Sequence, residues 1–209
     1  MAKFTIIAVL GLGLAAAGGL AAWRPGAPAS RPGFAETAVG SVRLRLNQAY
    51  LRDGDTPGTA PLVQLDLAAR FPDFRPLSSA ARRPDIEEVV FLRLQPEDSA
   101  LEPGERVARL YARFLERDQW NHPGGLLMRR FEAGSPYERE ELYIAPPEGR
   151  LFSARCMRPT QPPDGLPNTC VSEIRMHGLD VQIRFGPDLL PEWETLVAGA
   201  RGLVESMAR

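Results

Sequence analysis

The sequence predicts an α+β fold, in which an antiparallel meander sheet of about six to eight strands is covered on one face by two amphipathic helices. Two observations lead to this prediction. Several short segments alternate apolar and polar residues and are separated by prolines and glycines, as strands are. Two longer segments repeat apolar residues at helical spacing. A further helix, either a transmembrane anchor or a signal sequence, is expected at the N-terminus.

The first half of the chain is expected to hold three strands and a helix. Residues 41–51, 62–69 and 89–94 have the composition or the alternation of strands, and each is followed by proline or glycine within a few residues. Residues 103–119 place apolar side chains on one face and charged side chains elsewhere. This pattern predicts an amphipathic helix that lies on the sheet.

The second half is expected to continue the sheet and to end in a helix. Residues 126–131, 141–145 and 150–157 predict strands, and so do residues on either side of a turn at 177–180. Asp188 is expected to cap the last helix, whose apolar residues form one stripe facing the sheet.

The two cysteines are predicted to form a structural disulfide. Cys156 and Cys170 alternate with polar residues in two segments of strand periodicity, so both fall on apolar faces. Closing a ring of this size stabilises the folded state by about 3 kcal/mol if the geometry is unstrained. No Cys-x-x-Cys spacing and no histidine cluster favours a redox or metal role.

The N-terminal segment predicts the compartment. Residues 1–24 contain an uncharged, mostly apolar run of a length that spans a bilayer, which predicts an uncleaved anchor in the inner membrane. Cleavage as a signal peptide and release into the periplasm is the alternative. Residues 25–37 are expected to form a Pro/Gly/Ala tether, and residues 38–209 a single domain. A disulfide suits an oxidising compartment, so we expect the domain in the periplasm.

Composition and motifs narrow the function classes. The formal net charge is −1, so the chain has no excess of cations for a nucleic-acid backbone. No motif predicts a cofactor, a metal ion or a catalytic elbow. His122 and His177 lie in expected turns and are interpreted as exposed, and Glu87 and its acidic neighbours Asp85 and Glu88 as solvated charges at a strand end.

The sequence therefore favours a non-catalytic domain that binds a protein partner of unknown identity. The tethered, disulfide-bearing layout resembles that of small envelope proteins of Gram-negative bacteria, including immunity proteins that neutralise periplasmic toxins. Two loops are the expected contact surface, with the residues Arg82, Arg83, Pro159, Pro162, Pro163, Asp164 and Pro167. An envelope hydrolase with His122 or His177 as base, and a small-ligand binder with an apolar cavity between sheet and helix, are the alternatives.

Overall fold

The computed structural model describes residues 33–52, 60–77, 85–98, 101–158 and 168–208. The strands are β1 Phe34–Val39, β2 Val42–Asn47, β3 Leu65–Arg70, β4 Arg75–Pro76, β5 Val89–Pro96, β6 Leu115–His122, β7 Leu126–Phe131, β8 Glu140–Ile144, β9 Ser153–Met157, β10 Cys170–Met176 and β11 Leu179–Phe185. The helical elements are η1 Gln48–Tyr50, η3 Ile86–Glu88, η4 Pro103–Glu105, η5 Val107–Tyr111, η6 Ala112–Phe114, η7 Pro123–Gly125, η8 Pro187–Glu192 and α1 Trp193–Met207.

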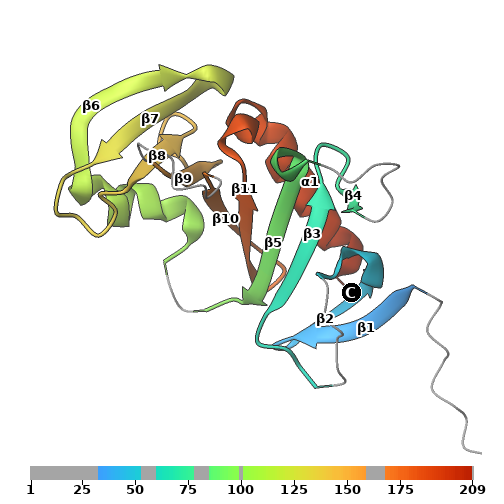
Figure 1. Ribbon diagram of the computed structural model, residues 1–209. Coiled ribbons are helices and arrows are strands. Elements are labelled where there is room, and N and C mark those ends of the chain that lie inside the picture. The colour runs from blue at the N-terminus through green and yellow to red at the C-terminus, as the bar shows by residue number, and fades with distance from the viewer. Residues whose placement is uncertain (1–32, 53–59, 78–84, 99–100, 159–167, 209) are drawn as a thin grey trace, which may run out of the picture.

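Within these residues, nine strands form one antiparallel sheet in the order β4-β3-β5-β11-β10-β9-β8-β7-β6 (Figure 1). From β6 to β11 each strand pairs with the next one in the chain, which confirms the predicted meander. β11 then pairs with β5, so the early strands join the end of the meander. β1 and β2 form a separate hairpin. The sequence did not predict the edge strands β4 and β6 or the first strand of the hairpin, β1.

The main core lies between α1 and one face of the sheet, where alternate residues of β3, β5, β10 and β11 point. Figure 1 shows α1 running behind β3 and β5. α1 buries one apolar stripe against the sheet, as predicted, and this stripe consists of Leu196, Val197, Ala200, Leu203, Val204 and Met207. Burying such a stripe stabilises the fold by roughly 25 cal/mol for each Å² of apolar surface removed from water.

A second, smaller core covers the opposite face of the sheet, at the end formed by β7, β8 and β9. It packs residues of η5 against β7 and β8, with Phe131, Leu142 and Ile144 fully or almost fully buried. Between Leu142 and Ile144, Tyr143 points to the main core instead. The expected placement of both helices on one face is therefore wrong, because the helical elements lie on opposite faces. The predicted first helix is present in shortened form, as the consecutive helical elements η4, η5 and η6 over residues 103–114.

The helix predicted over residues 103–119 ends at Phe114 because the following residues belong to β6. Residues 116–119 are all polar, so no apolar side chain holds them against the sheet as a helix. β6 pairs with β7 at Leu115 and again from Gln119, which lies opposite Arg129, with an irregularity of the register between them. The carbonyl of Phe114 accepts a hydrogen bond from the backbone of Glu132. Leu115 suits both patterns, since it is buried in the second core.

The predicted membrane segment and most of the tether lie outside the described residues. β1 begins at Phe34, within the range 25–37 that was expected as a tether, and pairs with β2 along its whole length. In the part of the chain that the structure describes, no helix is long and apolar enough to cross a membrane.

Candidate protein-binding groove

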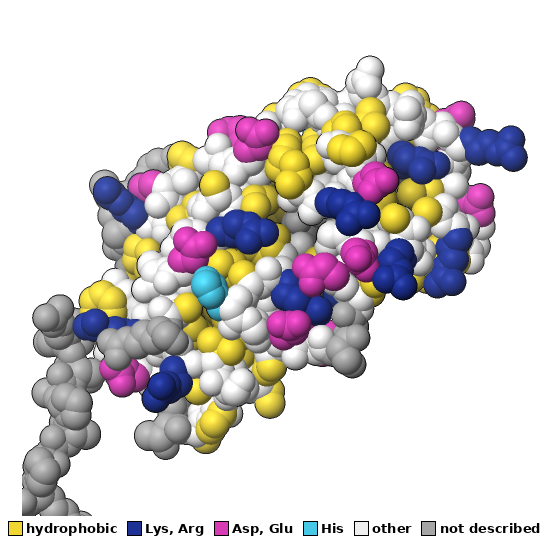
Figure 2. Space-filling model, turned by 180° about the vertical axis from the view of Figure 1, so that it is seen from behind, with side chains coloured by type: hydrophobic (Ala, Val, Ile, Leu, Met, Phe, Trp, Pro, Cys, Tyr) yellow, Lys and Arg dark blue, Asp and Glu magenta, His cyan; other side chains and the backbone are white. Residues whose placement is uncertain are grey.

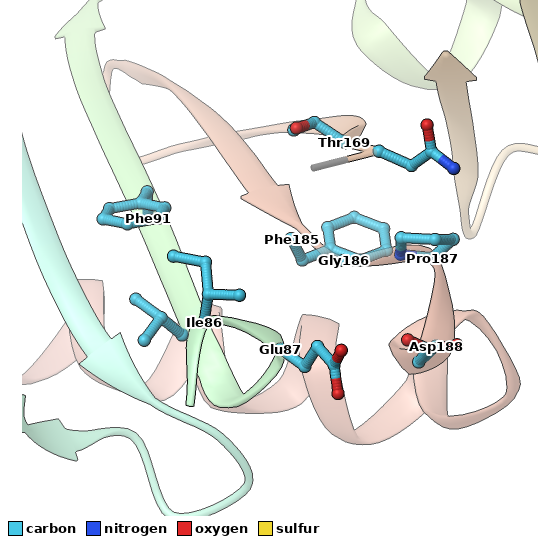
Figure 3. Close-up of a pocket in the computed structure, with 10 residues that line it drawn as sticks. Ile86, Glu87, Phe91, Thr169, Phe185, Gly186, Pro187 and Asp188 are labelled. Carbon is cyan, nitrogen blue, oxygen red and sulfur yellow. The ribbon is translucent and has the colours of Figure 1, made fainter. Parts of the chain in front are cut away.

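All seven residues of the predicted contact surface lie outside the described residues, in the segments 78–84 and 159–167. The described residues that border these segments nevertheless come together. Ile86 follows the first segment and Asn168 and Thr169 follow the second, and all three line one cleft (Figure 3). The structure therefore directs attention to this cleft.

The cleft, which we call the first hollow, opens where β5 and β11 separate. Their pairing ends at Phe91 opposite Arg184. Beyond that point β5 continues to pair with β3, whereas β11 leads through Gly186 and Pro187 into η8. The space between the diverging chains has a volume of about 290 Å³.

Apolar walls and two carboxylates characterise the first hollow. The walls are formed by Ile86, Val89, Phe91, Phe185 and Pro187. Ile86 is 58% exposed, which is unusual for a side chain of this size and polarity.

The carboxylates of Glu87 and Asp188 lie on one side of the first hollow, with the ring of Phe185 between them and Thr169 (Figure 3). Both side chains are exposed. Among the described residues neither makes a hydrogen bond or an ion pair through its carboxylate. The hollow is thus an apolar surface bordered by two negative charges that have no counterion among the described residues.

A second hollow of about 240 Å³ adjoins the first and shares Phe91 and Thr169 with it. We call the two together the groove. The second hollow is lined by Arg52, Asp66, Leu67, Phe91, Leu92, Arg93, Thr169 and Arg184.

The charges of the second hollow are mainly positive. Arg93 Nε donates to Asp66 Oδ1 at 2.9 Å. Burial raises the pKa of Asp66, but hydrogen bonds from Arg93 and Gln64 and the positive charges of Arg93 and Arg52 together lower that pKa below its ordinary value, so the carboxyl is ionised at neutral pH. Arg52 and Arg184 make no ion pair with a carboxylate in the described part of the chain. The Arg52 guanidinium lies 5.3 Å from the Phe91 ring centroid, and Arg184 donates a hydrogen bond to Gln182.

The disulfide fixes one wall of the groove. Cys156 and Cys170 face each other directly in the β9–β10 pair, both are buried, and they form the predicted bond. Thr169 precedes Cys170, and its carbonyl accepts a hydrogen bond from the backbone of Met157 at 3.1 Å. The bond therefore holds the chain next to Thr169 against β9.

Figure 2 shows no single-signed patch on the face that it presents, because arginine and acidic side chains lie interspersed among apolar ones. This distribution differs from that of the groove, where the charged groups of the first hollow are negative and those of the second hollow are mainly positive. Such separation favours recognition of a partner with a complementary charge order.

The two histidines lie in different surroundings. His177 is exposed in the β10–β11 turn, where it and Gly178 have positive φ values of 54° and 75°, as in a two-residue hairpin turn. His122 is partly buried, and its ring packs edge-on against Tyr143 at 4.9 Å. Its Nδ1 lies 3.0 Å from the carbonyl oxygen of Pro123. Within the described residues, neither imidazole bonds to a hydroxyl or a carboxylate, as a general base next to its nucleophile would.

A small cluster of aromatic and charged side chains surrounds His122 on β6, β7 and β8. The Tyr143 hydroxyl donates to Glu141 Oε2 at 3.1 Å. Burial and the neighbouring Glu141 carboxylate raise the pKa of Tyr143 to about 12, so the phenol keeps its proton at neutral pH. Arg130 lies over the Trp120 ring, 4.9 Å from its centroid, and 3.7 Å from Glu141. These contacts pair the polar and charged side chains of the cluster with one another and link β6, β7 and β8.

Sequence reasoning did not identify the residues that form the groove. Glu87 was interpreted as a solvated charge, and Asp188 as the cap of the last helix. The capping prediction is wrong, because Gly186 precedes η8, α1 begins at Trp193, and neither helix has a side-chain cap. The only signal in the sequence is that the two acidic groups follow or precede short apolar segments.

No family model and no curated protein sequence matches the chain. Two solved structures have a similar fold. Smlt3025, an immunity protein of the Stenotrophomonas maltophilia type IV secretion system, matches with a TM-score of 0.60 and 14% identity over 85% of this chain and 94% of that one. FrpD, an iron-regulated outer membrane lipoprotein of Neisseria meningitidis, matches with a TM-score of 0.50 and 14% identity over 84% of this chain and 92% of that one. At this identity the likeness concerns the fold.

Proposed function

We propose that this chain is a non-catalytic domain of the bacterial envelope that binds a protein partner through the groove. The observation that carries the proposal is the groove itself, which combines the exposed Ile86 and partly exposed apolar walls with four charged groups, those of Glu87, Asp188, Arg52 and Arg184, that have no counterion among the described residues. Exposed apolar side chains next to charged groups without counterions are characteristic of binding surfaces, since a partner supplies the missing contacts.

The proposed partner is a toxin or another envelope protein, so that the domain acts as an immunity-type inhibitor or as a component of an envelope complex. The fold shared with an immunity protein of a secretion system supports the first of these. The predicted anchor in residues 1–24 would hold the domain at the inner membrane, facing the periplasm, and the disulfide suits that compartment.

Affinity capture tests the proposal. The full-length chain, tagged at its C-terminus, is crosslinked in membranes of the source cells and purified under denaturing conditions. We expect one or a few proteins to be recovered reproducibly and to be lost when the crosslinker is omitted. Reproducible recovery of no protein beyond the untagged control contradicts the proposed function.

Intact-mass measurement of the purified chain completes the test of compartment. An uncleaved N-terminus is expected, together with a mass that increases by alkylation only after reduction. A chain that is alkylated at both cysteines without reduction contradicts a location in an oxidising compartment.

A further inference from the structure

We propose that the groove binds an extended segment of the protein partner that carries an arginine or lysine for the first hollow and an aspartate or glutamate for the second. This inference rests on the proposed function, because it assigns the chemistry of the partner to the site that function uses. It requires a partner segment with charges of opposite sign in a fixed order along the groove.

The first hollow selects a long basic side chain. Ile86, together with the partly buried Phe91 and Pro187, offers apolar surface on which the methylene groups of arginine or lysine can lie. Glu87 and Asp188 then lie where the cationic end of that side chain emerges (Figure 3). A purely apolar side chain would remove water from both carboxylates without replacing it, and an acidic side chain would be repelled.

The second hollow selects a carboxylate. The charge of Asp66 is already balanced by Arg93, which donates to both of its oxygens, at 2.9 and 3.3 Å. Arg52 and Arg184 remain available as donors, since neither has a carboxylate partner within the described ranges. Guanidinium groups bind carboxylates through paired, charge-assisted hydrogen bonds.

Phe91 and Thr169 link the two sites because both residues line both hollows. The Arg52 guanidinium lies 5.3 Å from the centroid of the Phe91 ring. A carboxylate that pairs with Arg52 would therefore lie next to this ring. The basic and acidic side chains of one partner segment can therefore be accommodated on either side of Phe91. The order of charges fixes the direction in which the segment lies.

Blocked, fluorescein-labelled peptides test this inference by fluorescence anisotropy with the full-length protein in detergent. One series carries a single arginine and a single glutamate separated by one, two or three serine or leucine residues. Matched peptides replace arginine by citrulline, glutamate by glutamine, or both. We expect at least one spacing to bind, and each neutral replacement to weaken that binding about tenfold, as is typical of lost hydrogen bonds to charged groups.

Protein variants assign each charge to its hollow. In the variant Glu87→Gln/Asp188→Asn the preference for arginine over citrulline should disappear, while the preference for glutamate over glutamine remains. In Arg52→Gln/Arg184→Gln the reverse should hold. The control pair Glu194→Gln/Arg201→Gln removes exposed charges of α1, which lines neither hollow, and should keep both preferences.

Several results would overturn the inference: no binding at any spacing, equal binding of the neutral peptide, or a control pair that acts like the groove variants. Far-ultraviolet circular dichroism of each variant must match the wild type, so that loss of folding is recognised. If capture recovers a partner whose yield falls in both groove variants while no peptide shows a charge preference, this inference fails while the proposed function stands. If the peptides bind as expected but capture recovers no partner, the proposed function fails while the charge preference of the groove stands.

Discussion

At the scale of single residues, two neighbouring glycines occupy the turn between β6 and β7 under different constraints. Both have positive φ values, 80° at Gly124 and 72° at Gly125. A Cβ atom at Gly124 would lie 2.6 Å from the carbonyl oxygen of Pro191, whereas one at Gly125 would meet no atom within 4 Å. The Gly124 carbonyl also accepts a hydrogen bond from Trp193 Nε1 at 3.0 Å.

The variant Gly124→Ala should therefore be less stable than Gly125→Ala. The left-handed backbone costs an alanine about 1–2 kcal/mol at either position, and Gly124→Ala adds the displacement of η8. Urea denaturation followed by tryptophan fluorescence measures the two free energies of unfolding. Equal losses in both variants would show that the approach of Pro191 to Gly124 does not constrain this turn.

Tyr143 provides a prediction about pH. Its pKa is raised from 10.0 to about 12, mainly by burial and then by Glu141. The folded state thus holds the phenolic proton more tightly than the unfolded state does. The resulting stabilisation is fully present below pH 10 and is lost as the pH rises through about 12.

Titration of tyrosinate absorbance in the wild type and in Tyr143→Phe checks this prediction. The difference between the two curves should have its midpoint near pH 12. A midpoint near the ordinary value of 10.0 would contradict the partial burial of the Tyr143 side chain against the main core.

The residues whose role was predicted correctly from the sequence are those whose role depends on residues close to them in the sequence. Cys156 and Cys170 were found because their alternation with polar residues is a local pattern. The groove was not found, because Glu87 and Asp188 are about a hundred positions apart and meet only through the β5–β11 pairing. No local pattern encodes where two strands separate.

At the scale of elements, α1 contains two glycines with opposite surroundings. Gly199 faces Phe74, whose ring a Cβ atom would overlap, whereas Gly202 is exposed and a Cβ atom there would meet nothing within 4 Å. Phe74 is itself buried, with a left-handed φ of 51°, and its ring packs edge-on against Phe71. The helix α1 therefore packs directly on the Phe74 ring at Gly199.

Gly202→Ala should stabilise the protein by about 1 kcal/mol, since alanine favours the helical backbone and has room there. Gly199→Ala should instead destabilise it, because the gain in helix propensity is smaller than the cost of moving the Phe74 ring out of its packed position. Thermal unfolding by circular dichroism compares the two variants. Stabilisation by both would mean that α1 does not pack on Phe74 as described.

The disulfide between β9 and β10 provides a second prediction at the scale of elements. Reduction should lower the free energy of unfolding by about 3 kcal/mol, which is the chain entropy of a closed loop of this length. The separation of the two cysteines is 14 residues. The control is the Cys156→Ala/Cys170→Ala variant, whose stability should not respond to the reductant. A wild-type protein that is equally stable in both redox states would contradict a structural role for the bond.

The elements that were predicted correctly have a clear period in the sequence, as in β10 and β11, where burial alternates along each strand. β6 was missed because its polar sequence has no period, and its conformation depends on pairing with β7. The placement of the two cores on opposite faces was also missed. It depends on which face of the sheet η5 meets, which side-chain periodicity within η5 does not determine.

At the scale of the whole molecule, the second hollow and the main core lie on opposite faces of the sheet, whereas the first hollow shares Phe185 with the main core. The main core and α1 lie on one face, and the second core covers the other face only at the β7–β9 end. The second hollow lies where β3, β5 and β11 present Asp66, Arg93 and Arg184 away from the main core. Groove charges can therefore be changed with little effect on stability, which makes binding and folding separable by experiment.

Site-specific photocrosslinking tests the central claim, that a protein partner is bound at the groove. A photoreactive benzoylphenylalanine is introduced in place of Ile86, which is 58% exposed at the first hollow, or of Leu151, which is 71% exposed and lines neither hollow. Irradiation of membranes that contain each full-length variant should produce a crosslinked protein from position 86 and none from position 151. No product from position 86, or the same product from both positions, would contradict the account.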